Sequence, residues 1–149
     1  MLDLILAIAH HLAVFILVAL FAAEFALLRP GIEGNRINQL ARIDGVYGAM
    51  AGVVILIGIT RVIFGTAGWE YYVGNWAFWA KMAAFLAMGL LSIKPTMAFV
   101  AWRRQLATNP AFTPGDSEVK ILRRFIHAEA TALLFIPVFA AAIPRIYGI

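Results

Sequence analysis

Four long apolar stretches alternate with short polar segments along the chain. The stretches cover about residues 2–28, 45–64, 76–102 and 118–143. Each approaches or exceeds the roughly 20 residues that an α-helix needs to cross the hydrocarbon layer of a bilayer. The pattern predicts a single all-α domain, residues 1–149, built as a bundle of four transmembrane helices.

The segments between the stretches carry helix-breaking and interfacial residues. Arg29-Pro30-Gly31 ends the first stretch, because proline and glycine interrupt helices and arginine suits the headgroup boundary. Residues 31–44 form a polar linker that we expect to be helical from about Arg36. The loop before Trp76 is rich in glycine and aromatic residues, as membrane interfaces are. Lys94-Pro95 predicts a kink in the third helix.

The composition agrees with a lipid environment. Of the 149 residues, 63% are hydrophobic and 13% are charged, whereas a soluble domain carries about 25% charged residues. The chain has no cysteine, which excludes disulfides, thiolate metal sites and a catalytic thiol. The net charge is +4, but no run of basic residues alternates with aromatics. We therefore expect the lipid bilayer as a partner and nucleic acid as none.

Basic residues divide unequally between the two sides of the predicted bundle. Short loops that are rich in Lys and Arg stay in the cytoplasm. Only Arg145 lies on the side of the termini. We therefore expect a multi-pass protein of a bacterial inner (plasma) membrane with both termini outside, in the periplasm. The basic residues on the opposite side are Arg29, Arg36, Arg42, Arg103, Arg104, Lys120, Arg123 and Arg124.

Several ionisable side chains lie within the apolar stretches, where each costs a few kcal/mol and usually faces the bundle interior. At 1.5 Å per residue, they fall into two layers. The outer layer, in the half nearer the termini, contains His10, His11, Arg61 and Lys81. The inner layer, in the half nearer the basic loops, contains Glu24, Asp44, Lys94, His127 and Glu129.

Helical phase indicates which of these side chains point inward. At about 100° per residue, His10 and Glu24 fall within roughly 40° of each other on the first helix, and His11 points aside. Tyr47 and Arg61 are likewise on one face of the second helix. We therefore expect His10, Glu24, Tyr47 and Arg61 in the interior.

The inner layer has two interpretations. In the first, its three carboxyl groups pair with Lys94 and Arg42 and form neutral, hydrogen-bonded clamps that hold the helices in register. His127 then belongs to the same buried polar network. In the second, the carboxyl groups form a proton relay, for which carboxylates in series are the usual material. The first interpretation is the simpler one.

The outer layer suits a cofactor. His10 and Lys81, an inward histidine and a lysine at similar depth on another helix, can be the two axial ligands of a haem b iron. Arg61 and Tyr47 are then the expected polar contacts, and Trp79 one aromatic wall for a porphyrin or a quinone-like molecule. The simpler alternative is that His10 only forms a hydrogen bond with a neighbouring helix.

Short motifs along the whole chain resemble DUF2214, a family of bacterial membrane proteins. This resemblance implies a membrane protein and no particular activity. The motifs are Ala9-His10-His11-Leu12, the segment Glu24-Phe25-Ala26-Leu27-Leu28-Arg29-Pro30-Gly31, Arg42-Ile43-Asp44 with Tyr47, Phe78-Trp79-Ala80-Lys81 and Ser92-Ile93-Lys94-Pro95-Thr96.

A more distant resemblance concerns the cofactor. The early histidine and the Trp-x-Lys at the start of the third stretch are similar to HemJ-type protoporphyrinogen IX oxidases. This resemblance implies b-type haem held by His10 and Lys81. Glu24 stands where that family has an aromatic, arginine-containing signature, so the substrate is not implied.

These features predict a haem-binding membrane oxidoreductase or electron carrier. Two other functions stay open. The chain can be a non-enzymatic accessory or assembly subunit, within a homo-oligomer or a larger membrane complex. It can also be a small proton or solute transporter that uses Glu24, Glu129 and Lys94.

Overall fold

The computed structural model describes residues 1–146, which form α-helices joined by short loops. Four helices are long: α1 (Leu2–Leu27), α2 (Asn35–Phe64), α4 (Trp76–Thr108) and α5 (Asp116–Ile146). A short helix, α3 (Trp69–Val73), connects α2 to α4. The long helices have 26 to 33 residues, or roughly 39–50 Å at 1.5 Å per residue. All four are long and apolar enough to span a membrane, which confirms the predicted four-helix fold.

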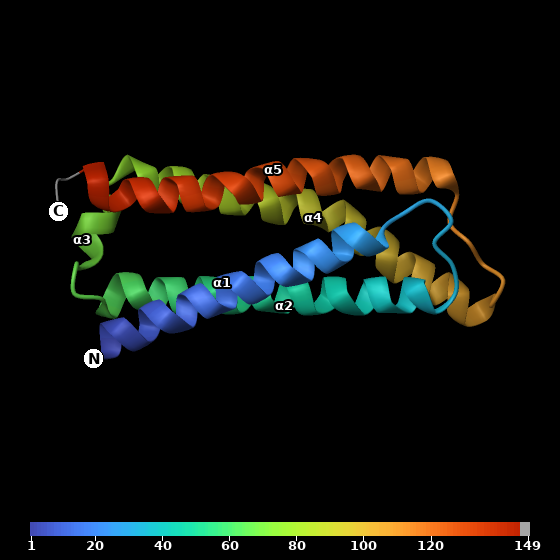
Figure 1. Ribbon diagram of the computed structural model, residues 1–149, viewed down its shortest axis with the longest axis horizontal. Coiled ribbons are helices and arrows are strands. Elements are labelled where there is room, and N and C mark those ends of the chain that lie inside the picture. Colours follow the sequence, from blue (N-terminus) through green and yellow to red (C-terminus); the bar gives the residue numbers. More distant parts are fainter. Residues whose placement is uncertain (147–149) are drawn as a thin grey trace.

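The helices form two antiparallel hairpins, α1 with α2 and α4 with α5 (Figure 1). Contacts are most extensive within each hairpin, and α2 and α4 provide the main contact between them. In Figure 1 the hairpins lie close together near the α1–α2 and α4–α5 loops and diverge toward the end where α1 begins. The start of α1 and the end of α5 therefore lie at the same end of the molecule.

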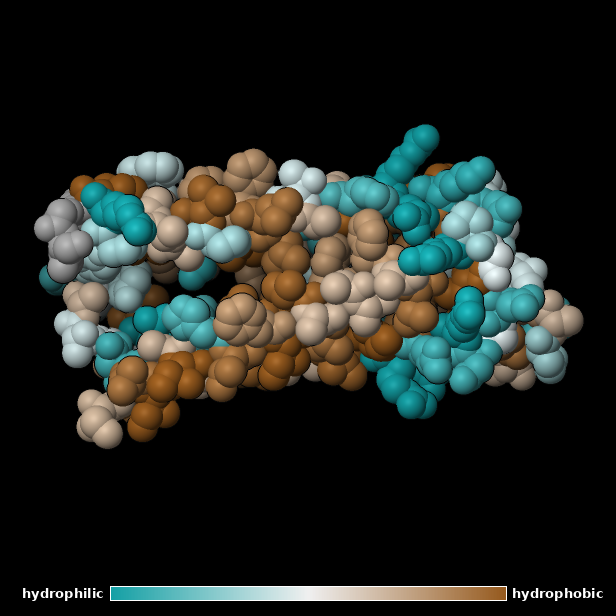
Figure 2. Space-filling view, viewed as in Figure 1, coloured by the Kyte–Doolittle hydropathy of each residue, from teal (hydrophilic) through white to brown (hydrophobic). Residues whose placement is uncertain are grey.

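Large apolar side chains cover the outside of the bundle. Phe15, Leu56, Met97 and Leu134 are each exposed by 66–70%. Figure 2 shows hydrophobic residues over the middle of the molecule and hydrophilic ones gathered at the loop end. An exposed apolar belt is stable only where lipid replaces water. The buried core is correspondingly thin.

The polar linker after the first stretch is helical, as expected from about Arg36. α2 begins at Asn35, ten residues before the apolar stretch at 45. Its first turns bury Ile37, Leu40 and Ala41, spaced so that one stripe of a helix faces the core. The segment 69–73, expected as loop, is the helix α3, preceded by Gly68 with a φ of +76° that favours glycine. α4 continues through Pro95.

Candidate functional site

Three nitrogen-bearing side chains of the outer layer come together between the hairpins. His10 lies on α1, Arg61 on α2 and Lys81 on α4, and all three are half-buried. Arg61 and Lys81 lie close enough to His10 to interact with it electrostatically, and Arg61 is similarly close to Lys81. The structure thus brings together three of the residues that the sequence placed at one depth.

The imidazole of His10 lies against the backbone of α2. A β-carbon at Gly58 would lie 3.5 Å from the His10 Cε1 atom and 3.9 Å from Nδ1. The Nδ1 atom is enclosed and has no hydrogen-bond partner within the described chain, and the same holds for Nε of Arg61. The expectation that His10 simply forms a hydrogen bond with a neighbouring helix is therefore not met among residues 1–146. His11, in contrast, is exposed, with its Nδ1 2.7 Å from the Ala7 carbonyl oxygen.

This group joins the two hairpins. His10 and Arg61 belong to one hairpin and Lys81 to the other. Figure 2 shows an opening that separates the two layers of helices in the half of the molecule nearer the termini. We refer to His10, Arg61 and Lys81 as the basic triad.

The inner layer contains a second polar group, at the interface where the hairpins meet. Glu24, Asp44 and Glu129 are exposed by only 2%, 3% and 0%. The Tyr47 hydroxyl donates to Oε1 of Glu129 at 2.6 Å, and the Thr96 hydroxyl donates to Oδ1 of Asp44 at 2.8 Å. The prediction that these three carboxyl groups face the interior is met. We refer to them as the carboxyl cluster.

Two residues expected around a cofactor are placed elsewhere. Tyr47 is bonded to Glu129 in the inner layer, because 14 positions along a helix share a face but are roughly 21 Å apart along its axis. Trp79 is 55% exposed, and its indole N–H donates to the Val73 carbonyl at 2.9 Å. Neither residue forms a hydrogen bond with the basic triad among residues 1–146.

The expected clamps between acids and bases are also not found among residues 1–146. Lys94 is exposed, with its Nζ 4.8 Å from the centre of the Phe125 ring. His127 is exposed, its Nδ1 lies 2.5 Å from the Arg123 carbonyl oxygen, and its ring meets that of Phe25 at 5.0 Å. A lysine side chain is long enough to reach the membrane–water interface and keep its charge in water. The depth of Lys94 along its helix therefore did not determine which groups it contacts.

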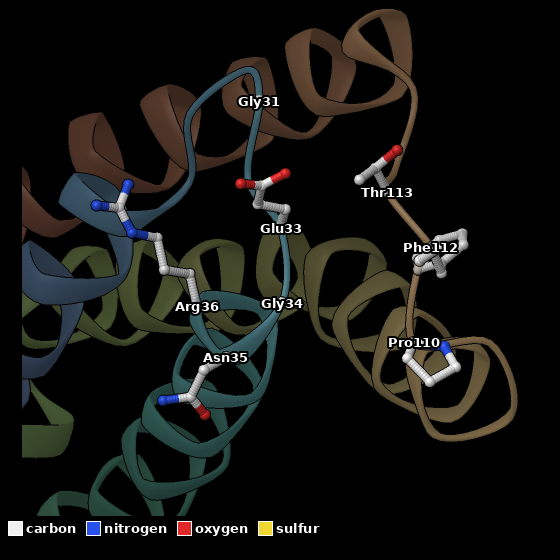
Figure 3. Close-up of a pocket in the computed structure, with 9 residues that line it drawn as sticks. Gly31, Glu33, Gly34, Asn35, Arg36, Pro110, Phe112 and Thr113 are labelled. Carbon is white, nitrogen blue, oxygen red and sulfur yellow. The ribbon is translucent and has the colours of Figure 1, made fainter.

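A cavity of about 520 Å³ lies at the opposite end of the molecule from the basic triad. Figure 3 shows it between the loop from Gly31 to Gly34 and the loop from Pro110 to Thr113. Glu33 and Arg36 are its only charged lining residues. A carboxyl group on a loop and a guanidinium in the first turn of α2, without a histidine among the lining residues, form no recognisable catalytic arrangement.

Sequence reasoning missed Asn75, a fully buried residue at the end of the molecule where α1 begins. Its side-chain oxygen accepts a hydrogen bond from the Ala77 amide at 3.0 Å, and its Nδ2 donates to the Ile143 carbonyl at 2.9 Å. Asparagine directly before a helix is a favoured N-cap, so the cap could have been predicted. The hydrogen bond from Asn75 to α5 could not have been predicted, because the local sequence does not specify which helix Asn75 will contact.

The chain matches the family model described as "Predicted membrane protein (DUF2214)" over residues 2–148. Comparison with curated proteins and comparison with solved structures each give no match. The match covers nearly the full length and agrees with the four membrane-spanning helices. The chain is a member of the DUF2214 family of membrane proteins.

Proposed function

We propose that this membrane protein binds b-type haem between its hairpins and acts in electron transfer or as an oxidoreductase. His10 would be one axial ligand and Lys81 the second, and Arg61 would bind a propionate. Bound haem would supply one-electron redox chemistry, which the ligands, burial and hydrogen bonds of the protein tune. The resemblance to HemJ-type oxidases implies the same two ligands.

One observation carries the proposal: the His10 imidazole is half-buried and forms no hydrogen bond in the described chain. A histidine ring without a hydrogen bond calls for another role. Iron would be ligated through Nε2, because Nδ1 is enclosed against α2, and imidazole nitrogen is a common axial ligand of haem iron.

The charge of the basic triad supports the choice of ligand. Arg61 and Lys81 lie near each other, and no ion pair of either is found within residues 1–146. A cation inside a membrane protein usually has a partner, and haem carries two propionates that can provide one. The Arg61 guanidinium can donate two parallel hydrogen bonds to such a carboxylate, while an uncharged Lys81 can offer its amine to iron.

The absorption spectrum of the purified protein tests the proposal. We expect a Soret band in protein from haem-replete cells, and its loss in His10→Ala. His11→Ala is the matched control, because His11 is adjacent but exposed, and it should retain the band. Lys81→Ala should keep the haem with an altered ligand field, and Arg61→Ala should weaken binding about tenfold, the effect of losing about 1.4 kcal/mol.

Two outcomes would contradict this function. Wild-type protein that is colourless, and that shows no Soret band after haem is added in detergent, removes the cofactor. Equal loss of the band in His10→Ala and His11→Ala removes His10 as the ligand. The alternative function, proton transport, would use the buried acids of the carboxyl cluster instead of the basic triad.

A further inference from the structure

The carboxyl cluster joins the two hairpins. Glu24 and Asp44 belong to α1 and α2, and Glu129 belongs to α5. The two hydrogen bonds of the cluster, from Tyr47 on α2 to Glu129 on α5 and from Thr96 on α4 to Asp44 on α2, both cross between the hairpins. Asp44 and Glu129 are each close enough to Glu24 to interact with it electrostatically. Three buried acids therefore lie near one another where the hairpins meet.

No cation neutralises these acids within residues 1–146. The basic side chains nearest in sequence are directed elsewhere: Lys94 lies over the Phe125 ring, and Arg123 donates to the Leu28 carbonyl. Arg42 and His127 are exposed. On every helix that contacts the cluster, the described groups that face it are carboxyl or hydroxyl groups.

Two carboxyl oxygens also lack a hydrogen-bond donor. Oε2 of Glu24 and Oε2 of Glu129 are enclosed and have no partner in the described chain, although the two residues are exposed by only 2% and 0%. Tyr47 and Thr96 supply one donor each. Three ionised carboxylates need many more donors than this.

Ionisation of all three groups would be very costly. Moving one carboxylate from water into a protein interior costs several kcal/mol even after relaxation. Like charges that share a site repel each other and hinder each other's ionisation. A protonated carboxyl group carries no charge and gains an O–H donor, which can satisfy an acceptor beside it. The two donors present serve Glu129 and Asp44, one each, and no described group donates to Glu24.

We propose that Glu24, Asp44 and Glu129 form a proton-binding site in which at least two of the three carboxyl groups carry a proton at neutral pH. The ligand is a proton rather than a metal ion, because no group of three or more His, Cys, Asp or Glu side chains in residues 1–146 is arranged to hold a metal. Because the cluster lies across the contact between the hairpins, its proton occupancy controls that contact. Loss of a second proton would place two negative charges within it.

Infrared spectroscopy of the protein in lipid measures this directly. Exposed carboxyl groups are ionised at neutral pH, so the carbonyl stretch of a carboxylic acid reports protonated, sequestered groups. We expect the difference between wild type and the combined Glu24→Gln, Asp44→Asn and Glu129→Gln variant to contain two or three carboxylic acids per chain. Glu33→Gln is the control, because Glu33 is exposed on a loop, and it should leave this absorption unchanged.

A difference of one carboxylic acid or none would overturn the proposal. If the combined variant does not fold, the single variant Glu24→Gln, whose side chain mimics the neutral acid, should remove at least one carboxylic acid from the spectrum, because Glu24 receives no hydrogen bond from the described residues and is therefore one of the protonated groups. Retention of the full absorption in that variant overturns the proposal as well. The result does not depend on haem, since any propionate signal is common to the compared proteins and cancels.

Discussion

Tyr47 donates one of the two hydrogen bonds that link the hairpins. Tyr47→Phe removes the donor and leaves a buried Glu129 oxygen without one, which costs about 1–3 kcal/mol of unfolding free energy. Tyr72→Phe is the matched control, because the Tyr72 hydroxyl makes no hydrogen bond within residues 1–146. Reversible unfolding in bicelles measures both variants. Equal stability of the two proteins would show that the bond contributes nothing.

The sequence correctly predicted which side chains point inward where the helical phase alone decides their direction. Glu24 and His10 share a face of α1 and both point inward, and His11 is exposed. Phase does not tell which side chains meet across helices. Lys94 was expected beside the acids but lies over Phe125, because a lysine chain is long enough to choose among several neighbours. Partners depend on the packing of the helices, which the pattern does not encode.

At the scale of the helices, Asn75 fixes the beginning of α4 and attaches it to α5. Asn75→Ala removes the cap and the bond to Ile143, and should lower the unfolding free energy by about 2 kcal/mol. Asn75→Ser keeps a cap but is too short to reach Ile143, so it should lose about half as much. Thermal unfolding in detergent compares the two variants. A serine variant as unstable as the alanine variant would show that the cap has no effect.

Helix ends were harder to predict than helix centres. The apolar runs gave the four spans because burial in lipid requires a continuous apolar surface. The apolar run at 45–64 does not include the first turns of α2, where Ile37 and Leu40 are buried among polar residues, although a helix from about Arg36 was expected in the linker and α2 does begin at Asn35. In these turns only one stripe of the helix faces the core, and the mean hydropathy over all positions does not reveal it. The short helix α3 was not predicted, because its five residues are too few to show a helical period.

At the scale of the whole molecule, the division into two hairpins positions both polar groups. The hairpins meet at the carboxyl cluster and diverge near the basic triad (Figure 1). The sequence predicted the two layers by depth, but hydropathy does not say which helices pair or where they separate. The opening between the hairpins therefore became visible only with the fold. The triad residues are half-buried, while the carboxyl cluster is fully buried.

The orientation of this molecule in the membrane follows from its basic loops and can be tested with single cysteines, because the natural chain has none. Exposed Arg29, Arg103 and Arg124 lie at the end with the α1–α2 and α4–α5 loops. Such residues favour the cytoplasmic side. We therefore propose that this end faces the cytoplasm and that the basic triad lies in the outer half of a bacterial inner membrane.

Two exposed positions on opposite ends distinguish the orientations: Thr66 between α2 and α3, and Glu33 between α1 and α2. In intact spheroplasts, a membrane-impermeant maleimide should label Thr66→Cys and should label Glu33→Cys only after permeabilisation. The cysteine-free natural chain gives the background. The reverse pattern would place the basic loops outside and the triad in the cytoplasmic half. Any redox partner of the proposed haem would then have to approach from the cytoplasm, because electron transfer requires the partner on the side where the cofactor lies.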